Sequence, residues 1–251
     1  MTLQPTRRGD YGFDAPYGPI LMISVGTCLL ALAAWGIASH NTASRPRMIA
    51  IVFQFAGAIW LYLLAAKFIH TTRAGKFSVW AELLQGFDLK GDESLLDIGC
   101  GRGAVLLMAA QFLPRGKAVG VDVWSKTDQS GNAELVTRRN AELEGVAERV
   151  ELHTGDMRQL PFADDSFDIA VSSLAIHNIF GAGERARAIK EAARVLKKGG
   201  KLAIADIRFT KAYAKELEAQ GLTITARRSL GVRFWYGPPW AATHLVMATK
   251  P

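Results

Sequence analysis

The sequence has little cysteine, only Cys28 and Cys100, and the two stand in unrelated surroundings. A disulfide is therefore not expected, which fits a reducing compartment. The chain also lacks the cysteine and histidine spacing of zinc sites and any stripe of alternating basic and aromatic residues. The net charge of +7 thus does not by itself indicate nucleic acid. We expect neither a bound metal nor a nucleic-acid partner, and note that membrane-surface proteins carry the same positive bias.

Two long stretches, 19–39 and 48–66, lack charged residues altogether. At about 1.5 Å rise per residue, a helix of either length approaches the ~30 Å thickness of a hydrocarbon core. Trp60 and Tyr62 lie towards the end of the second stretch, as interfacial aromatic residues do. We predict a transmembrane helical hairpin over 19–70; a buried hairpin in a soluble fold is the alternative. A cleaved signal peptide fits poorly, because the first stretch is too long and a second follows at once.

The charges that flank the hairpin predict its orientation. Positive residues concentrate on the cytoplasmic side of a membrane, and a hairpin returns both of its ends to one side. The residues to compare are Arg7, Arg8, Lys67, Arg73 and Lys76 at the two ends, against Arg45 and Arg47 in the loop. The excess at the ends predicts a cytoplasmic N-terminal segment, 1–18, and a cytoplasmic domain, 71–251, anchored in the inner (cytoplasmic) membrane.

Strand and helix patterns alternate along the predicted domain. The expected strands are 95–98, 118–121, 149–153, 167–172 and 201–206, with helices at 104–113, 132–144, 185–196 and 211–219. The run 197–200, two lysines and two glycines, is expected to stop the third of these helices. An amphipathic helix within 77–87 would join the hairpin to the domain. This alternation predicts an α/β fold with a doubly wound, mostly parallel sheet that binds ligands at the carboxyl ends of its strands.

The segment 94–104, SLLDIGCGRGA, reads as a short strand, a glycine-dense turn and the start of a helix. Such a turn at a helix N-terminus cradles a nucleotide-type ligand. The turn residues assigned to the ligand are Gly99, Cys100, Gly101 and Gly103. Its spacing also formally satisfies the dinucleotide fingerprint, so an NAD-linked oxidoreductase is an alternative. Asp97 argues against that alternative, because a carboxylate at the strand tip repels a pyrophosphate and favours a cation.

This segment resembles motif I of the class I S-adenosylmethionine-dependent methyltransferases, an acidic residue followed by alternating glycines. The resemblance extends over 94–206 and implies a seven-stranded sheet closed by an antiparallel pair, which the strand-like runs 223–229 and 243–249 would supply. It implies S-adenosylmethionine as cofactor and S-adenosylhomocysteine as product. The sulfonium and ammonium groups of that cofactor agree with the charge of Asp97.

Further cofactor residues follow the second strand. Asp122 can accept hydrogen bonds from both ribose hydroxyls, although a helix cap is the alternative. Val123 is assigned beside it, and Trp124 either covers the adenine or simply packs. The polar loop 125–132 is expected to form a lid, with Asp128 and Gln129 as contacts, or else to be a solvated loop.

The resemblance implies roles for two residues after the third strand. Asp156 would accept the adenine amino group, and the backbone amide of Met157 would meet the ring.

The fourth strand leads into 172–179, SSLAIHNI, where we place the catalytic surface. Ser173 is assigned to the cofactor and Asn178 to acceptor positioning. His177 is the candidate general base, with an ordinary pKa suited to neutral pH. A base is needed only if the acceptor is a hydroxyl or a similar protonated group; otherwise His177 is structural.

Several methyltransferase chemistries are disfavoured by what this region lacks. It has no Asn/Asp-Pro-Pro-Tyr motif of the enzymes that methylate amino groups of bases, and 175–183 has no clustered acids of the metal-dependent catechol type. A single cysteine in the domain disfavours arsenic methylation.

These observations predict a membrane-anchored methyltransferase that acts on a hydrophobic or amphipathic small molecule: a lipid, a quinone-like compound, or a thiol or hydroxyl compound. A non-catalytic S-adenosylmethionine-binding sensor or scaffold is the alternative from another class. The aromatic run 233–240 would contact an apolar acceptor, rest in the membrane interface, or pack as a turn. Whether the segment 11–17 caps the site, and the oligomeric state, stay open.

Overall fold

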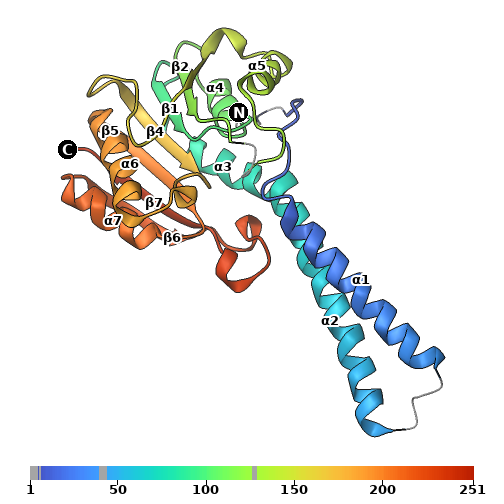
Figure 1. The fold of residues 1–251 in the computed structure, drawn as a ribbon. Coiled ribbons are helices and arrows are strands. Elements are labelled where there is room, and N and C mark those ends of the chain that lie inside the picture. Colours follow the sequence, from blue (N-terminus) through green and yellow to red (C-terminus); the bar gives the residue numbers. More distant parts are fainter. Residues whose placement is uncertain (1–4, 6, 40–43, 126–128) are drawn as a thin grey trace.

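The computed structural model describes residues 5, 7–39, 44–125 and 129–251. Two long helices, α1 (Tyr17–Ala38) and α2 (Arg45–His70), form an antiparallel hairpin that projects from an α/β domain (Figure 1). By length and composition both are apolar enough to cross a membrane.

Small residues let the two hairpin helices approach closely. Ala33 and Ala58 are completely buried, and a Cβ on Gly26 would lie 3.5 Å from the Ala58 carbonyl oxygen. Thr27 and Tyr62 add a hydroxyl–hydroxyl hydrogen bond of 3.0 Å. Small residues at the contact and large ones outside are typical of helices that pair in lipid. The large apolar side chains left exposed on the hairpin include Ile20, Leu21, Leu32, Trp35, Val52, Phe53, Ile59, Trp60 and Leu63.

The hairpin joins the domain without a break in the helix. A five-residue π-helical turn, Thr71–Gly75, connects α2 directly to α3 (Lys76–Gln85). The loop before the last strand packs on this turn, where the Thr71 hydroxyl donates a 2.6 Å hydrogen bond to the Trp235 carbonyl. The predicted amphipathic helix is therefore present, as a continuation of α2.

The domain contains one seven-stranded sheet, in the order β3-β2-β1-β4-β5-β7-β6. Its strands are β1 (Ser94–Ile98), β2 (Lys117–Asp122), β3 (Val150–Thr154), β4 (Phe167–Ser173), β5 (Leu196–Asp206), β6 (Thr223–Ser229) and β7 (His244–Thr249). The first five run parallel, and β7 is antiparallel to both β5 and β6. This confirms the mostly parallel seven-stranded sheet and its antiparallel terminal pair.

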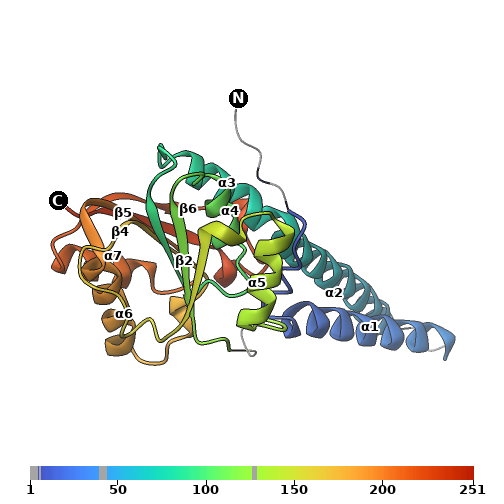
Figure 2. The ribbon, with the colours of Figure 1, turned by 90° about the horizontal axis from the view of Figure 1, so that it is seen from above.

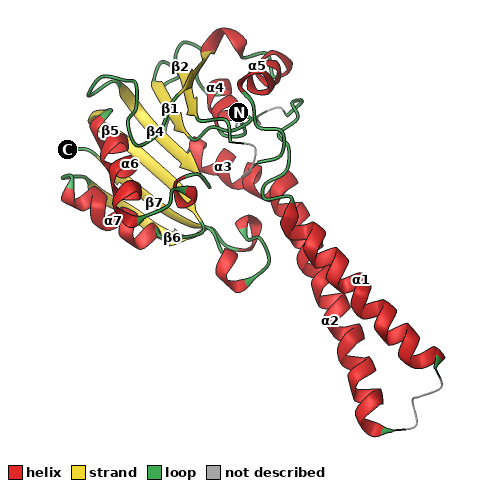
Figure 3. Ribbon diagram, viewed as in Figure 1, coloured by secondary structure: helices red, strands yellow, loops and turns green. Residues whose placement is uncertain are grey.

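Helices cover both faces of the sheet (Figures 2 and 3). They are α4 (Leu106–Gln111), α5 (Glu134–Leu143), α6 (Ala182–Arg194) and α7 (Thr210–Ala219), in addition to α3. Leu95 and Leu96 are both fully buried, but Leu95 packs with the residues of α3 and α4 and Leu96 with those of α6 and α7. Strands buried on both faces read as continuous apolar runs, which explains their clear sequence signal.

Several predicted boundaries differ from the structure, and two of the differences have a clear physical cause. The helix after β1 begins at Leu106 rather than at 104, because the glycine turn extends over the preceding residues. The run Lys197–Gly200 does not stop a helix: α6 ends at Arg194, and β5 already begins at Leu196, paired with Phe167. Pairing of Leu196 with Phe167 begins the strand before this run, and the run itself spans a register shift between β4 and β5.

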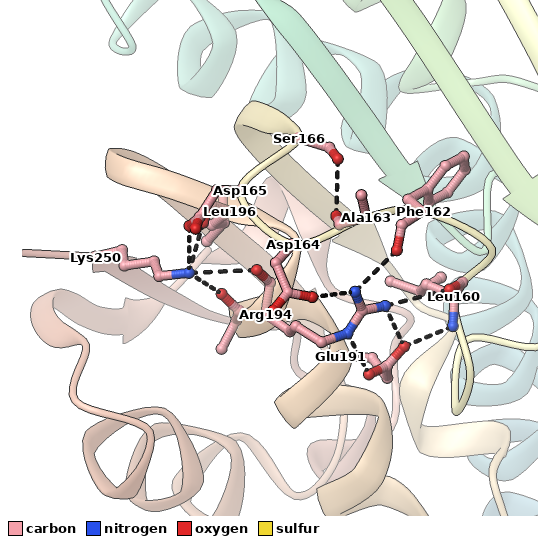
Figure 4. Close-up of polar contacts among 11 residues, drawn as sticks. Leu160, Phe162, Ala163, Asp164, Asp165, Ser166, Glu191, Arg194, Leu196 and Lys250 are labelled. Carbon is pink, nitrogen blue, oxygen red and sulfur yellow. Dashed lines mark hydrogen bonds and ion pairs between the residues drawn. The ribbon is translucent and has the colours of Figure 1, made fainter.

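Two basic side chains fix the loop that leads into β4 (Figure 4). Arg194 donates hydrogen bonds to the carbonyls of Leu160 and Phe162 and to the Glu191 carboxylate. Lys250 donates to the Leu196 carbonyl and forms an ion pair with Asp165, both at 2.9 Å or less. Loop, α6 and chain end are thereby joined, which fixes β4 and the segment that follows it.

The N-terminal segment packs into the domain across the predicted boundaries. The Tyr11 ring is buried in the core beside α3, and its hydroxyl donates a 2.8 Å hydrogen bond to Glu144. The Ser130 amide donates a hydrogen bond to the Phe13 carbonyl, and the Phe13 amide donates one to Ser130 Oγ. The Phe13 ring stacks on Phe68 at the base of α2. The segment thus lies between the hairpin and the glycine turn.

We predict that Gly75→Ala destabilises the protein by about 1–3 kcal/mol, because the added Cβ would lie 1.8 Å from the Arg233 carbonyl oxygen. The Gly75 backbone is already α-helical (φ −60°), so helix propensity alone would favour alanine. Denaturant unfolding in detergent measures the change. Gly183→Ala, where a Cβ meets nothing within 4 Å, is the matched control and should not destabilise. Equal stability of both variants would contradict the close approach.

Candidate active site

A cavity of about 660 Å³ opens at the carboxyl ends of the central strands. It is bounded by β1, β2 and β4, by the segment after β4, by α3 and by the N-terminal segment. It brings together most of the predicted site residues: Asp97, Gly99, Cys100, Gly101, Asp122, Val123, Gln129, Asp156, Met157, Ser173, His177 and Asn178. Gly103 and Trp124 are not among the residues that line it.

Backbone forms the floor of the cavity at the glycine turn. Gly99 has φ +76°, and a Cβ there would lie 2.4 Å from the Ala175 Cβ. Gly101 has φ +51°, and a Cβ there would lie 2.4 Å from Gln129 Oε1. Side chains are thus excluded where a ligand would contact the main chain. Gly103 serves packing instead, because its Cβ would meet the side chains of Leu107 and Thr137.

The Asp97 carboxyl group and the Cys100 thiol, both beside this turn, are buried. Asp97 is 2% exposed, and burial, with the nearby charge of Asp122, raises its pKa to about 8. Its Oδ1 has no hydrogen-bond partner among the described residues. Burial likewise raises the pKa of the Cys100 thiol well above its ordinary value, so Cys100 is a neutral wall residue. An unpartnered buried carboxyl oxygen suits a cationic ligand, whose charge would favour the ionised form of Asp97.

Asp122 organises the neighbouring loop. Its Oδ2 accepts a hydrogen bond from the Gly101 amide (2.8 Å), and its Oδ1 accepts from the Trp124 amide (2.6 Å) and Asn132 Nδ2 (3.2 Å). The Trp124 indole donates to Thr154 Oγ1 at 2.8 Å. The tryptophan therefore packs outside the cavity lining, and Val123, largely exposed, takes the place beside Asp122 on its wall.

The predicted lid contacts the glycine turn through Gln129. Its Oε1 accepts from the Arg102 amide (3.0 Å), while its Nε2 donates to the Tyr11 carbonyl (3.1 Å). An isolated antiparallel bridge pairs Asp14 with Gln129. Gln129 and the N-terminal segment therefore lie on the same side of the cavity. Asp128 lies outside the described residues.

Asp156 is held by Arg158, whose Nε lies 3.0 and 2.9 Å from its two carboxylate oxygens. These hydrogen bonds lower the pKa of Asp156. Arg158 also reaches Glu184 at 3.0 Å. Met157 follows on the cavity wall, with its Cε close to Gly99.

His177 lies above a buried acid that the sequence analysis did not single out. Asp206, at the carboxyl end of β5, is completely buried and accepts hydrogen bonds from the His177 amide (3.1 Å) and the Ile207 amide (2.7 Å). Its Oδ1 lies 2.6 Å from His177 Nδ1, although the pair is not aligned as a hydrogen bond. We interpret this contact as electrostatic orientation of the ring. The position of Asp206 at a strand end was the available sequence signal.

Aromatic residues form the far end of the cavity. Phe68, Phe77, Trp80 and Tyr236 line it, together with Tyr17 at the start of α1. The Trp80 indole donates a 2.9 Å hydrogen bond to Ser173 Oγ, which ties this end to β4. Of the predicted aromatic run, Phe234 and Tyr236 are buried, whereas Trp240 is 71% exposed. These residues come from segments far apart in the chain, so no local pattern identified them as a group.

Comparison with known proteins agrees with this geometry. Residues 96–204 match the family model described as a methyltransferase domain. Methyltransferase GfsG of Streptomyces halstedii is 36% identical over 126 residues, which cover 50% of this chain and 42% of that protein. UbiE of Paracoccus denitrificans, an enzyme of ubiquinone/menaquinone biosynthesis, is 35% identical over 132 residues (52% and 49%). Sterol 4-C-methyltransferase strm-1 of Caenorhabditis elegans is 30% identical over 139 residues (55% and 38%).

The chain thus spans less than half the length of each of these relatives. Solved structures share the fold. Geranyl diphosphate methyltransferase with bound S-adenosylmethionine superposes with a TM-score of 0.57 at 15% identity, covering 70% of this chain and 85% of the other. The [4+2]-cyclase SpnF gives 0.56 at 23% identity, covering 68% and 80%.

The sheet order, the glycine turn and the cavity define the class I methyltransferase fold. With the family match and the named relatives, residues 96–204 resemble the domain of an S-adenosylmethionine-dependent methyltransferase. The unpartnered Asp97 oxygen and the side-chain-free glycine turn fit its cationic cofactor. Within the described ranges, no group of three or more His, Cys, Asp or Glu residues could hold a metal ion.

We predict that Asp97→Asn weakens S-adenosylhomocysteine binding by about 10-fold or more, because a charge-assisted contact contributes about 1.5–3 kcal/mol. Calorimetric titration of the detergent-purified protein measures the affinity. The same substitution should change the pH dependence of the ligand-free protein. Since the folded pKa is near 8 and the unfolded value near 3.8, the folded state holds more protons between these pH values.

The contribution of Asp97 to stability therefore falls as pH rises from about 4 to 8, and the asparagine variant lacks this fall. Relative to wild type, Asp97→Asn should be more stable at pH 8 than at pH 5, as measured by unfolding without ligand. An unchanged affinity together with a pH profile identical to wild type would remove the assigned role.

Proposed function

We propose that this protein is a membrane-anchored methyltransferase that transfers the methyl group of S-adenosylmethionine to a hydrophobic or amphipathic small molecule. The observation that carries this proposal is the continuity of one cavity. It extends from the glycine turn to an aromatic end that includes Tyr17 and Phe68, residues of the two hairpin helices. An acceptor dissolved in a bilayer would meet the cavity at the base of the hairpin.

The hairpin supports the membrane part of the proposal. Its large side chains are apolar and exposed over most of its length, a surface that water disfavours and lipid accommodates. Two strongly exposed apolar residues, Val232 and Trp240, lie in the loop between β6 and β7, on the side of the domain from which the hairpin projects (Figure 1). Tryptophan is favoured where membrane meets water. We assign this loop to the membrane interface.

Relatives and structural neighbours support an apolar acceptor. Their names include a sterol methyltransferase, demethylmenaquinone and ubiquinone/menaquinone methyltransferases and geranyl diphosphate methyltransferases. An arsenite methyltransferase also matches. Thiolate chemistry of that kind finds no support here, because Cys100 is a buried neutral thiol and Cys28 lies in α1.

The roles of this chain's residues follow from their positions. Bound S-adenosylmethionine would supply the electrophilic methyl group. Asp97 would bind the cationic group of the cofactor, and Asp122 would bind its ribose hydroxyls. The glycine turn would contact the cofactor through its backbone, and Gln129 would close the lid. Asp206 orients His177 through Nδ1, which leaves Nε2 to take the proton of a hydroxylic acceptor. An acceptor bound among the aromatic rings would exclude water, and alignment of the reacting groups would supply much of the rate.

Methyl transfer is tested with the full-length protein in detergent, S-adenosylmethionine labelled in its methyl group, and a lipid extract of bacterial membranes. Label should enter the organic phase. His177→Gln should lower the rate by about 10²–10⁴-fold, the usual contribution of acid–base catalysis, with unchanged S-adenosylhomocysteine affinity. His153→Gln, which alters a surface histidine paired with Glu151, is the control. Binding without any transfer would favour the non-catalytic sensor; equal rates in both variants would remove His177 as base.

Orientation in the membrane is tested by cysteine labelling in a Cys28→Ala background. Ser44→Cys, at the start of α2, should react with an impermeant maleimide added to intact cells. Lys198→Cys, on the domain surface, should react only after lysis. The opposite pattern would place the domain outside the cytoplasm. Labelling of both positions in intact cells would contradict a spanning hairpin.

A further inference from the structure

The aromatic end of the cavity contains a buried polar cluster of Asp14, Lys76 and Tyr236. Lys76 Nζ lies 2.8 and 2.7 Å from Asp14 Oδ1 and Oδ2, and the Tyr236 hydroxyl donates a 2.8 Å hydrogen bond to Asp14 Oδ2. The side chains of Lys76 and Asp14 are only 7% and 17% exposed. All three residues line the cavity. They come from the N-terminal segment, the start of α3 and the loop before β7.

This cluster has no net charge. Burial and the charge of Asp14 raise the pKa of Tyr236 well above its ordinary value, so the phenol is neutral. The ammonium of Lys76 and the carboxylate of Asp14 then cancel. An uncompensated charge at a buried position is strongly unfavourable, which makes this balance a property that a ligand must preserve.

The remaining charges on the cavity wall do not offset a charged acceptor. Among the described lining residues, the only other lysine or arginine is Arg158, and it is paired with Asp156 and Glu184. Asp97 and Asp122 face the cofactor end. Phe68 packs edge-on against Tyr236, and Lys76 Nζ lies over the Phe77 ring. A phosphate would therefore meet Asp14 without a spare cation, and an ammonium would meet Lys76 without a spare carboxylate.

We propose that the Asp14–Lys76–Tyr236 cluster binds the polar end of the methyl acceptor and selects an uncharged hydroxylic amphiphile over an anionic or a cationic one. The proposal rests on the proposed function and narrows its acceptor class. A hydroxyl both donates and accepts hydrogen bonds. It can therefore donate to a remaining lone pair of Asp14 and accept the third N–H of Lys76 while the charge balance is preserved. The aromatic rings would contact the apolar body of the molecule.

Binding of three probes to the full-length protein in detergent, saturated with S-adenosylhomocysteine, tests this selection. The probes are decyl hydroquinone kept reduced, farnesyl diphosphate and dodecylamine. Wild type should bind the hydroquinone at least 10-fold more tightly than either charged probe. Asp14→Asn leaves Lys76 uncompensated and should shift the preference at least 10-fold towards the diphosphate. Lys76→Met leaves Asp14 uncompensated and should shift it equally towards the amine.

Tyr236→Phe keeps the ring and the charge balance and removes one hydroxyl. It should weaken hydroquinone binding by about 3–10-fold without changing the preference among probes, with S-adenosylhomocysteine affinity as the check on folding. Lys197→Met removes the cation of a surface pair with Asp168 and is the matched control, expected to change nothing. If the charge variants fail to fold, Tyr236→Phe decides, and an unchanged hydroquinone affinity would overturn the proposal.

The proposal would also be overturned if wild type preferred either charged probe, or if Asp14→Asn and Lys76→Met both kept the wild-type preference. Parallel assays of labelled methyl transfer separate the two proposals. If methyl groups are transferred to membrane lipids but the variants keep the wild-type probe preferences, the proposed role of the cluster is contradicted and the methyltransferase proposal stands. If the probe preferences change as expected but no methyl transfer is detected, the binding-site proposal stands and the proposed reaction is contradicted.

Discussion

The structure depends on one continuous helix, Arg45–Gln85, which belongs to the hairpin at one end and to the methyltransferase domain at the other. Because backbone hydrogen bonds continue through the π-helical turn at Thr71–Gly75, the hairpin has no flexible joint to the domain in this segment. Phe68, Lys76 and Trp80 therefore reach the cavity from a single rod. A hairpin joined to the domain only by a flexible linker would not contribute to the cavity wall, whereas this hairpin forms part of it.

Two further segments complete the cavity wall that the helix forms in part. The N-terminal segment crosses the glycine turn through Tyr11 and Asp14, and the loop before β7 packs against Gly75 and contributes Tyr236. Class I methyltransferases share the sheet and the cofactor cradle, and fold alone leaves the acceptor undefined, since a cyclase has the same fold. In this chain the residues of the aromatic end lie outside the family match, before residue 96 and after residue 204. The acceptor selection that we propose therefore rests on residues outside the matched domain.

The electrostatics divide the cavity into two ends of different character. At the cofactor end, Asp97 Oδ1 has no hydrogen-bond partner in the described part of the chain, and the raised pKa of Asp97 reflects burial that a cation would offset. At the aromatic end, Asp14 and Lys76 satisfy each other. An unpaired buried acid is a site prepared for charge, whereas a paired one is a site that charge would disrupt. The same residue type, aspartate, thus serves opposite purposes according to its partners.

The order of elements could be predicted from sequence because strands buried on both faces are continuous apolar runs and the glycine turn follows a local rule. That Asp97, Gly99, Gly101 and Asp122 lie together was predictable for the same reason, because they lie at strand ends, which parallel topology brings to one edge. Gly103 and Trp124 do not line the cavity, because packing with Leu107 and a hydrogen bond to Thr154 decide their positions. Lys197–Gly200 has the local pattern of a helix stop but lies within β5, which begins at Leu196.

The cluster of Asp14, Lys76 and Tyr236 and the pairing of Asp206 with His177 were decided only by the tertiary structure. Sequence by itself determined the strands of the sheet, the glycine turn of the cofactor cradle and the two long apolar helices, because each depends on residues that are adjacent in the chain. Contacts between residues 14 and 236 depend on how the whole chain closes, and no local pattern carries that information.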